Sequence, residues 1–464
     1  MNLRGVRDLA IAARLRNRLV SVHINHKRIA ASALLIGVLT ALAKLFVAGR
    51  EVAIAWRYGV SATADSYQLA LTIVTWVPMF LAGAMGVVLV PRLVKLRRQG
   101  AARLQLLREL NGSALLLSCG VSLGIVLLTA VAARILASHL DLRTLHLTTV
   151  LAEQMAPVGL FVTLAGYLTA RLQARERFSY TVAEAVPAVV IALLVAGPFQ
   201  ISGTMPLVIG TLTGFFAQLL ILVLLVVRGD PPLGGVEFEH ASNEWPTLYG
   251  AILMMALGQL LVTAATPVDQ GFAARVGEGA VATLGYATRI VTLLTGLATV
   301  VVGRAVLPVL SETVANDDFR VGRRQALQWA GFMFCIGCVA GVILWTLAPE
   351  LVRVLFERGA FGAAATAEVS AAVRFGAVQL PFYFPGIVLV QWYAATDRFR
   401  DILSITIAAL ALKVGLNAAL APTLGVRGIM LSSALMYAWT LLLMIVMLAW
   451  KRRPPAAQRD WGTH

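Results

Sequence analysis

The feature that most constrains this chain is a series of apolar runs, each about as long as a membrane-spanning helix, separated by short charged or turn-rich segments. A helix needs about 20 apolar residues to cross the hydrocarbon core of a bilayer. Hydrophobic residues make up 59% of the chain and charged residues 13%, which excludes a soluble enzyme and a disordered protein. The twelve expected spans lie near residues 31–57, 66–90, 112–137, 147–170, 179–199, 203–228, 246–274, 279–309, 326–348, 367–395, 400–422 and 425–450.

The net charge of +16 would suggest a nucleic-acid partner in a soluble protein, but here the positive-inside rule accounts for it. Basic runs follow five of the six even-numbered spans, at 92–98, 171–177, 320–324, 398–400 and 451–453, and the opposite loops are sparse in Lys and Arg. We therefore expect a multi-pass protein of the bacterial inner membrane with both termini in the cytoplasm and no nucleic-acid partner.

An internal repeat predicts the architecture. The segment Ile73-Val74-Thr75 recurs as Ile290-Val291-Thr292, and Pro91 recurs as Pro308, both 217 residues later. Six spans separate the copies, an even number, so the two halves have the same orientation, and such parallel repeats enclose a site between two lobes. We expect an all-α membrane protein with a basic cytoplasmic segment (1–30), a six-helix lobe (31–228), a cytoplasmic linker (229–245), a second six-helix lobe (246–450) and a basic tail (451–464).

Basic residues inside predicted spans are the candidate functional residues, because a charge at bilayer depth costs about 2.5–3.5 kcal/mol on insertion scales unless it finds a partner, water or a ligand. Lys44 and Arg50 in the first span and Arg289 in the eighth lie at depths that reach one cavity. Intramembrane acids are fewer, so the cavity is predicted to be electropositive. The arginine fork favours phosphate oxygens, and we expect an anionic, phosphate-bearing ligand.

A purely structural interpretation of these charges stays open. Arg50 can pair with Glu51 or Asp65, and the long side chains of Arg304 and Arg374 can reach a membrane interface.

Asp269 is a candidate coupling-ion residue, because it follows Pro267 inside the seventh span, a pattern used both for bending and for cation binding. Lys413 is a candidate counter-charge, although straight helices place the two at depths about 15 Å apart. Coupling to Na⁺, to H⁺ or to the membrane potential is left open. No catalytic or metal-binding motif is found, so we expect a transporter without a cofactor rather than an enzyme.

Several motifs resemble the MurJ (MviN) family of lipid-linked oligosaccharide flippases, within the multidrug/oligosaccharidyl-lipid/polysaccharide (MOP) exporter superfamily. They occur in the family's order across most of the chain. The motifs are Gly49-Arg50-Glu51, Tyr58-Gly59 with Ala64-Asp65, Gly285-Tyr286-Ala287-Thr288-Arg289, Leu307-Pro308-Val309-Leu310-Ser311, Leu355-Phe356-Glu357-Arg358-Gly359-Ala360-Phe361 and Tyr393-Ala394-Ala395-Thr396-Asp397.

The resemblance implies a V-shaped pair of lobes whose basic cavity carries a polyprenyl-diphosphate headgroup outward by alternating access. It implies Lys44, Arg50, Asp65 and Arg289 as the substrate-binding residues, and we take Asp269 and Asp397 as candidate coupling-ion residues. The expected partners are a lipid-linked saccharide and membrane lipids, and the expected state is a monomer.

Two departures from the family bear on the saccharide. The second span lacks the family's arginine-rich stretch, and the chain has twelve expected spans where members that handle the peptidoglycan precursor lipid II commonly have fourteen. Both favour a unit of an exopolysaccharide, capsule or O-antigen over lipid II. The alternatives are a multidrug exporter of the same superfamily and a membrane polysaccharide polymerase or ligase. Candidate sugar contacts, which equally suit interhelical hydrogen bonds, are Gln68, Gln154, Gln259, Gln379, Tyr383 and Asn417.

Overall fold

The computed structural model describes residues 42–96, 100–136, 141–177, 179–197, 202–229, 235–242, 244–315, 319–396 and 398–450, with the backbone alone at 100–102, 136, 229, 297, 300–315, 319 and 450. In the first half, a helix over residues 42–58 precedes α2 (Ala62–Lys95), α3 (Gly100–Leu136), α4 (Leu142–Met155), α5 (Pro157–Ala174), α6 (Tyr180–Ala183), α7 (Val186–Ala196) and α8 (Met205–Gly229). The second half contains α9 (Trp245–Thr263), α10 (Ala265–Val276), α11 (Ala280–Ala315), α12 (Phe319–Phe356), α13 (Ala363–Ala377), α14 (Leu380–Ala395), α15 (Phe399–Leu424) and α16 (Val426–Trp450). No strand occurs within these ranges, which confirms the all-α prediction.

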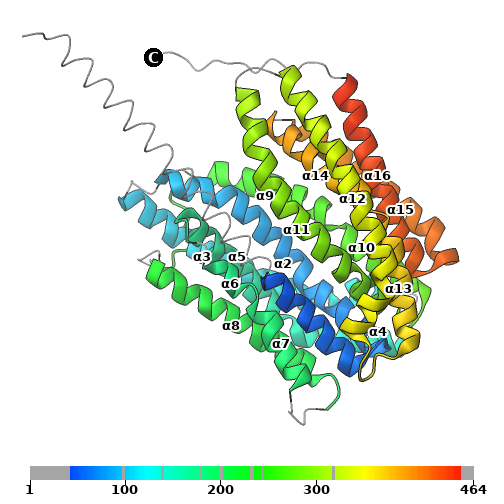
Figure 1. The fold of residues 1–464 in the computed structure, drawn as a ribbon. Coiled ribbons are helices and arrows are strands. Elements are labelled where there is room, and N and C mark those ends of the chain that lie inside the picture. Colours follow the sequence, from blue (N-terminus) through cyan, green and yellow to red (C-terminus); the bar gives the residue numbers. More distant parts are fainter. Residues whose placement is uncertain are drawn as a thin grey trace, which may run out of the picture.

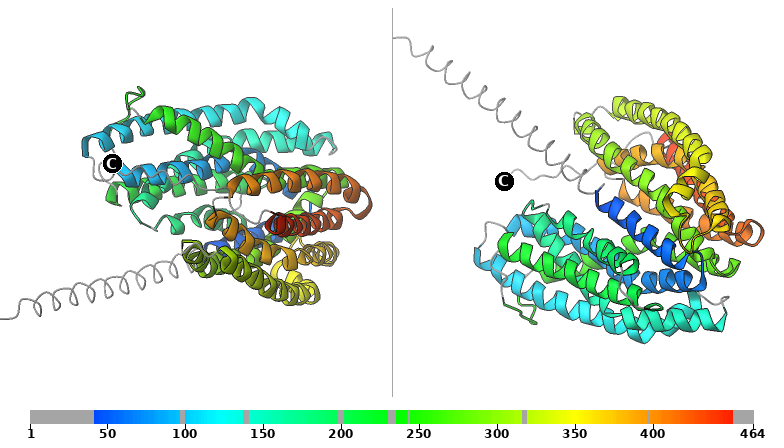
Figure 2. Two further views of the ribbon diagram at one scale, coloured as in Figure 1. Left: turned by 90° about the horizontal axis from the view of Figure 1, so that it is seen from above. Right: turned by 60° about the horizontal axis from the view of Figure 1, so that its bottom comes forward.

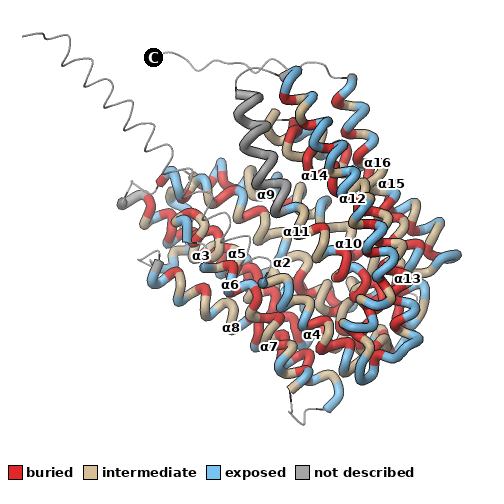
Figure 3. Tube along the Cα trace, viewed as in Figure 1, coloured by how far each residue is buried: buried red, intermediate tan, exposed pale blue. Residues whose placement is uncertain are grey.

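Each predicted span coincides with a helix or a consecutive helix pair in the described ranges. Seven helices there are long and apolar enough to cross a membrane, and nine when each of two bent pairs counts as one span. The outer faces are apolar as well: Leu127 is 68% exposed and Leu253 64%, and exposed residues recur along the peripheral helices (Figure 3). Exposed leucines along long helices suit contact with lipid, so the protein is a multi-pass membrane protein.

The two halves repeat each other in structure as they do in sequence. Helices α8 and α16 have the same length, and α16 begins and ends 221 residues after α8. The break between α4 and α5 bends the chain by 49°, and the corresponding break between α13 and α14 bends it by 45°. Each bend lies beside a proline, Pro157 or Pro381, which cannot donate the helical hydrogen bond. Figures 1 and 2 show the halves as two bundles side by side.

Each lobe has its own buried cores, and one core joins the lobes. In the first half Leu151, Met155 and Ile191 belong to one cluster of buried side chains, and in the second half Trp392 and Tyr393 belong to another. A third cluster combines Ala55 and Leu69 of the first half with residues of α11 to α13, including Tyr286 and Phe361. The lobes are therefore in apolar contact where the helix over 42–58 ends and α11 begins.

The described part of the linker, residues 235–242, lies against α3. Glu237 donates its backbone N–H to the carbonyl of Arg108 at 3.1 Å, and a Cβ at Gly112 would meet the Glu237 carbonyl oxygen at 2.0 Å. The buried Glu109 carboxylate accepts from the Trp245 indole at 2.6 Å and from the Ser242 backbone at 3.0 Å. These contacts fix the start of α9 on the first lobe.

Candidate functional site

A cavity of about 690 Å³ lies between the first lobe and α11. The helix over 42–58 contributes Arg50, and α11 contributes Arg289, so the basic residues come from both halves of the chain. The other walls come from α2, α5, α7 and α8. Gly86 of α2 leaves space open, since a Cβ there would meet nothing nearer than Gln173 at 4.0 Å. Gly166 of α5 instead allows close packing on α2, because a Cβ there would lie 2.3 Å from the Ala82 Cβ.

One carboxylate oxygen joins the two arginines. Glu51 Oε1 lies 2.5 Å from Arg50 Nη2 and 3.2 Å from Arg289 Nε. The Glu51 side chain is 3% exposed and that of Arg50 8%, whereas that of Arg289 is 43% exposed toward the cavity. Arg50 Nε is buried and has no hydrogen-bond partner among the described residues. The trio therefore carries one net positive charge and keeps donor groups available to an anion.

The polar wall of the cavity, formed by α5, α8 and the break between α6 and α7, carries polar groups that sequence reasoning did not assign. Thr169 and Gln173 lie four residues apart on one face of α5, Gln218 lies on α8, and Glu184 lies at the break between α6 and α7. All four line the cavity, and Glu184 is exposed within it. The spacing of Thr169 and Gln173 beside Gly166 was the available signal in the sequence.

Lys44 is near the cavity but does not line it. Its side chain lies against Gly296 of α11, where a Cβ would approach Lys44 Cε to 3.0 Å. The predicted direct role of Lys44 in substrate binding stays a prediction.

Asp65 lies outside the cavity lining and binds the start of α11. It is fully buried, and its two carboxylate oxygens accept the backbone N–H groups of Gly279 at 2.6 Å and Ala282 at 2.7 Å. A carboxylate at this position satisfies two N–H groups that a helix start leaves without partners and complements the helix dipole. The geometry makes Asp65 a capping residue between the lobes in this conformation, where the sequence suggested a substrate contact.

Two more hydrogen bonds join the lobes at the same end of the molecule. The Tyr286 hydroxyl donates to the Gly59 carbonyl at 3.0 Å, and the Ala360 N–H donates to the Trp56 carbonyl at 2.8 Å. Gly59 has a φ of +60° and leaves no room for a Cβ, which would meet the Ala360 carbonyl oxygen at 2.5 Å. The molecule is therefore closed at the end where the helix over 42–58 stops.

Asp269 forms an ion pair with Lys413. Lys413 Nζ lies 3.1 Å from Asp269 Oδ1, and Asn417 donates to the same oxygen at 2.8 Å. This confirms the suggested pairing with Lys413. Asp397, the other candidate coupling-ion residue, lies outside the described residues.

Arg374 and the suggested sugar contacts lie outside the cavity lining. Arg374 donates from Nε to the Trp345 carbonyl at 3.1 Å, which ties α13 to α12, and the Arg304 side chain lies outside the described ones. Asn417 bonds within the second lobe, in line with the interhelical interpretation. None of the suggested sugar contacts lines the cavity of Arg50 and Arg289.

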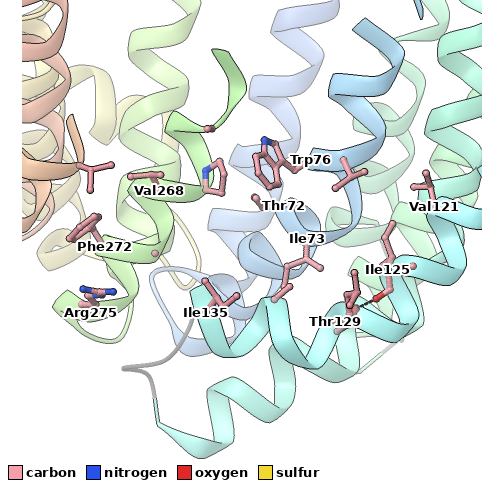
Figure 4. Close-up of a pocket in the computed structure, with 18 residues that line it drawn as sticks. Thr72, Ile73, Trp76, Val121, Ile125, Thr129, Ile135, Val268, Phe272 and Arg275 are labelled. Atoms are coloured by element: carbon pink, nitrogen blue, oxygen red, sulfur yellow. Dashed lines mark hydrogen bonds between the residues drawn. The ribbon is translucent and has the colours of Figure 1, made fainter. Parts of the chain in front are cut away.

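A second cavity, of about 570 Å³, lies between α2 and α3 of the first lobe and α10 of the second. Figure 4 shows its lining, which is apolar along Ile73, Trp76, Ile125 and Phe272, with Arg275 at one end. Apart from Arg275, this lining suits hydrocarbon better than the charges of a phosphate or the hydroxyls of a sugar. The polar cavity is the better headgroup site.

The family model described as lipid II flippase MurJ matches residues 54–464, which is most of the chain. The chain belongs to this family. A "Probable lipid II flippase MurJ" of Rhizobium tropici is 32% identical over 157 residues, a match that spans 34% of this chain and only 30% of that protein. The "Lipid II flippase MurJ" of Burkholderia cenocepacia is 24% identical, over 85% of this chain and 78% of its own length.

Solved structures share the fold. "Lipid II flippase MurJ, inward closed conformation" aligns with a TM-score of 0.77 at 18% identity, over 90% of this chain and 87% of that one. An inward-facing multidrug-resistance transporter of the MATE family, in the MOP superfamily, aligns with a TM-score of 0.71 at 16% identity, over 91% and 97%. The family and the fold confirm the two-lobe MurJ/MATE-like architecture predicted from the repeat.

Proposed function

We propose that this protein is a flippase that moves a polyprenyl-diphosphate-linked saccharide from the inner to the outer leaflet of the bacterial inner membrane. The observation that carries the proposal is the pair of arginines in the cavity: Arg50 with an unpartnered buried Nε, and Arg289 exposed to the cavity. Membership of the lipid II flippase family supports the class of substrate. No bond is made or broken in such a reaction, so the protein must only bind, shield and release the headgroup.

Phosphate recognition follows from the Glu51 trio. A diphosphate offers several charged oxygens to the arginine forks, whereas Glu51 offers a single oxygen to both. The bound diphosphate competes with Glu51 for Arg289 and uses the free Nε of Arg50. Because Arg50 and Arg289 belong to different lobes, that exchange alters the link between the lobes at the moment when substrate arrives.

Saccharide recognition belongs to the polar wall. The amides of Gln173 and Gln218 both donate and accept hydrogen bonds, and the Glu184 carboxylate accepts from hydroxyl groups. The family match supports a lipid-linked peptidoglycan precursor of the lipid II class. The uncharged cavity face of α2, with Met79, Ala82 and Gly83, favours instead a unit of another envelope polysaccharide.

Alternating access supplies the route. The lobes are tied at one end through Asp65, Tyr286 and Trp56, and the basic loops lie at the opposite end. With both termini in the cytoplasm, the tied end faces outward, so the cavity loads from the cytoplasmic leaflet. The two lobes within one chain suffice for this motion, which supports a monomer as the working unit.

The test is lipid flipping in proteoliposomes with fluorescently labelled lipid II, using wild type, Arg50→Ala, Arg289→Ala and, as a matched control outside the cavity, Arg374→Ala. A hydrogen bond to a charged group is worth about 1.5–3 kcal/mol, so each cavity variant should bind the lipid at least tenfold more weakly. Both cavity variants should therefore flip the lipid more slowly than wild type. The control should behave as wild type. Wild-type flipping rates in both cavity variants would contradict the proposal.

The same experiment separates the rivals. A hydrophobic cation in place of the lipid tests multidrug export. Transport of the cation at the same rate by wild type and Arg289→Ala would favour that function. A lipid-linked exopolysaccharide repeat unit, flipped faster than lipid II, would assign the other saccharide class. Glycosidic bond formation by the purified protein would point to a polymerase or ligase.

A further inference from the structure

A closed polar network lies inside the second lobe, apart from the diphosphate cavity. Lys413 Nζ contacts Asp269 Oδ1 at 3.1 Å and donates to the Ser433 hydroxyl at 2.6 Å. Asn417 donates to Asp269 at 2.8 Å, and the Ser432 hydroxyl donates to the Asn417 carbonyl oxygen. The network thereby connects α10, α15 and α16 through one full positive and one full negative charge.

The ammonium is the most enclosed charge of the network. Lys413 is 1% exposed, and Asn417 and Ser432 are fully buried, while the Asp269 side chain is 18% exposed. The Asp269 carboxylate of α10 and the Ser433 hydroxyl of α16 therefore contact one cationic nitrogen of α15, and Asn417 and Ser432 extend the network from Asp269. Such oxygen ligands are the kind that hard metal cations prefer in proteins.

The fold shared by the two lobes does not require this network. With the 221-residue offset that relates α8 to α16, Lys413 corresponds to Ala192 and Asn417 to Ala196 of the first lobe. Both positions are alanine there. Since a buried ion pair is seldom more stabilising than apolar packing, the pair in the second lobe points to a role beyond packing.

The network is placed to act on the contact between the lobes. Helix α10 carries Asp269 on one side, and its residues Val268, Gly271 and Phe272 line the apolar cavity against α2 and α3 (Figure 4). The charge state around Asp269 therefore bears on a helix that must shift against the first lobe when the lobes rock.

We propose that the Lys413 ammonium is the resident cation of this lobe and takes the place that an alkali metal ion could occupy beside the same oxygen atoms. Transport is then independent of Na⁺ and K⁺, and removal of the ammonium vacates a site of Asp269, Asn417, Ser432 and Ser433 that accepts such an ion. The independence of transport from Na⁺ and K⁺ rests on the flippase function proposed above, whereas ion binding at the vacated site does not depend on that function.

The first test is thermal unfolding of purified wild type, Lys413→Ala and the charge-neutral pair Lys413→Ala with Asp269→Asn, each in NaCl, KCl or choline chloride of equal ionic strength. Choline is too large for the site and controls for screening. We expect the midpoint of Lys413→Ala to rise by about 2 °C or more in NaCl or KCl relative to choline, with no rise in the other two proteins. Equal midpoints of Lys413→Ala in all three salts would overturn the proposal.

The second test uses wild type alone and so does not depend on how a variant folds. Flipping of labelled lipid II is measured in proteoliposomes with Na⁺ or K⁺ replaced by choline on both sides. A rate within twofold of the original supports the resident ammonium, and a loss of tenfold or more without the metal ion overturns it. Absence of flipping under every condition would count against the proposed function instead, while the unfolding test would still decide the site.

Discussion

Arg289 Nε lies 3.2 Å from Glu51 Oε1, an ion pair that joins α11 of the second lobe to the helix over 42–58 of the first. The same oxygen is bound by Arg50, so one buried carboxylate holds together two arginines that would otherwise repel each other. This single contact links the charge of the cavity to the relative position of the lobes.

The first prediction concerns Glu51→Gln. Removing one partner of a buried ion pair costs about 3–5 kcal/mol, because the remaining charge is left uncompensated. We expect a lower melting midpoint for Glu51→Gln, and a larger stabilisation by added polyprenyl diphosphate than in wild type, since the ligand then supplies the missing negative charge. Thermal unfolding with and without the lipid measures both.

The matched control is Glu350→Gln, because Glu350 pairs with Arg353 at 3.5 Å on the exposed surface, where such pairs contribute about 0–1 kcal/mol. Equal midpoints for Glu51→Gln and Glu350→Gln would show that the buried trio does not hold the lobes.

A second prediction separates sugar recognition from phosphate recognition. Gln173→Ala and Gln218→Ala should weaken binding of a lipid-linked disaccharide about fivefold or more, as expected for losing one net hydrogen bond of about 1 kcal/mol, while binding of polyprenyl diphosphate without sugar stays unchanged. Native mass spectrometry of both lipids gives the ratio. Gln154→Ala, which changes a glutamine outside the cavity lining, is the control. Loss of both lipids in parallel would assign these glutamines to packing.

The spans and the two-lobe fold were predictable because they depend on local patterns. Apolar runs near 20 residues mark the helices, and the recurrence of Pro91 as Pro308 marks the repeat that the bounds of α2 and α11 confirm. Lys44, Arg50 and Arg289 stood out because charges inside apolar runs are rare, and two of the three line the cavity.

Other parts of the site depend on long-range geometry that composition does not encode. Asp65 accepts hydrogen bonds from backbone N–H groups 214 and 217 residues away. Nothing in the identity of Gly279 or Ala282 indicates that their N–H groups bind a distant carboxylate. The depth estimate that separated Asp269 from Lys413 assumed straight helices, whereas the chain breaks between α9 and α10 at Ala264. Gln173 and Gln218 look in sequence like any interhelical hydrogen-bond donor.

The third prediction tests the capping role of Asp65. Replacement by alanine removes two hydrogen bonds at the start of α11, and loss of a helix cap costs about 0.5–2 kcal/mol. We expect Asp65→Ala to slow flipping while binding of polyprenyl diphosphate stays within twofold of wild type. Ser61→Ala, which removes a cap inside the first lobe, controls for a general loss of helix stability. Binding as weak as in Arg289→Ala would instead make Asp65 a substrate contact.

The last prediction concerns the closed end. Gly359 has a φ of +61°, and a Cβ there would lie 2.3 Å from the Trp56 carbonyl oxygen. Alanine at this position costs about 1–2 kcal/mol for its backbone conformation alone, and the clash adds to that cost by pushing the loop after α12 off the helix over 42–58. We expect Gly359→Ala to lower the melting midpoint and to shift the lobes toward the conformation open at this end. A membrane-impermeant thiol reagent should then label a cysteine introduced at Val60 faster in Gly359→Ala than in the protein that keeps Gly359.

Gly250→Ala, at a helical glycine with open space around it, should leave both the melting midpoint and the labelling rate unchanged. Equal labelling rates in Gly359→Ala and Gly250→Ala would mean that the contact between Trp56 and Ala360 does not keep this end shut.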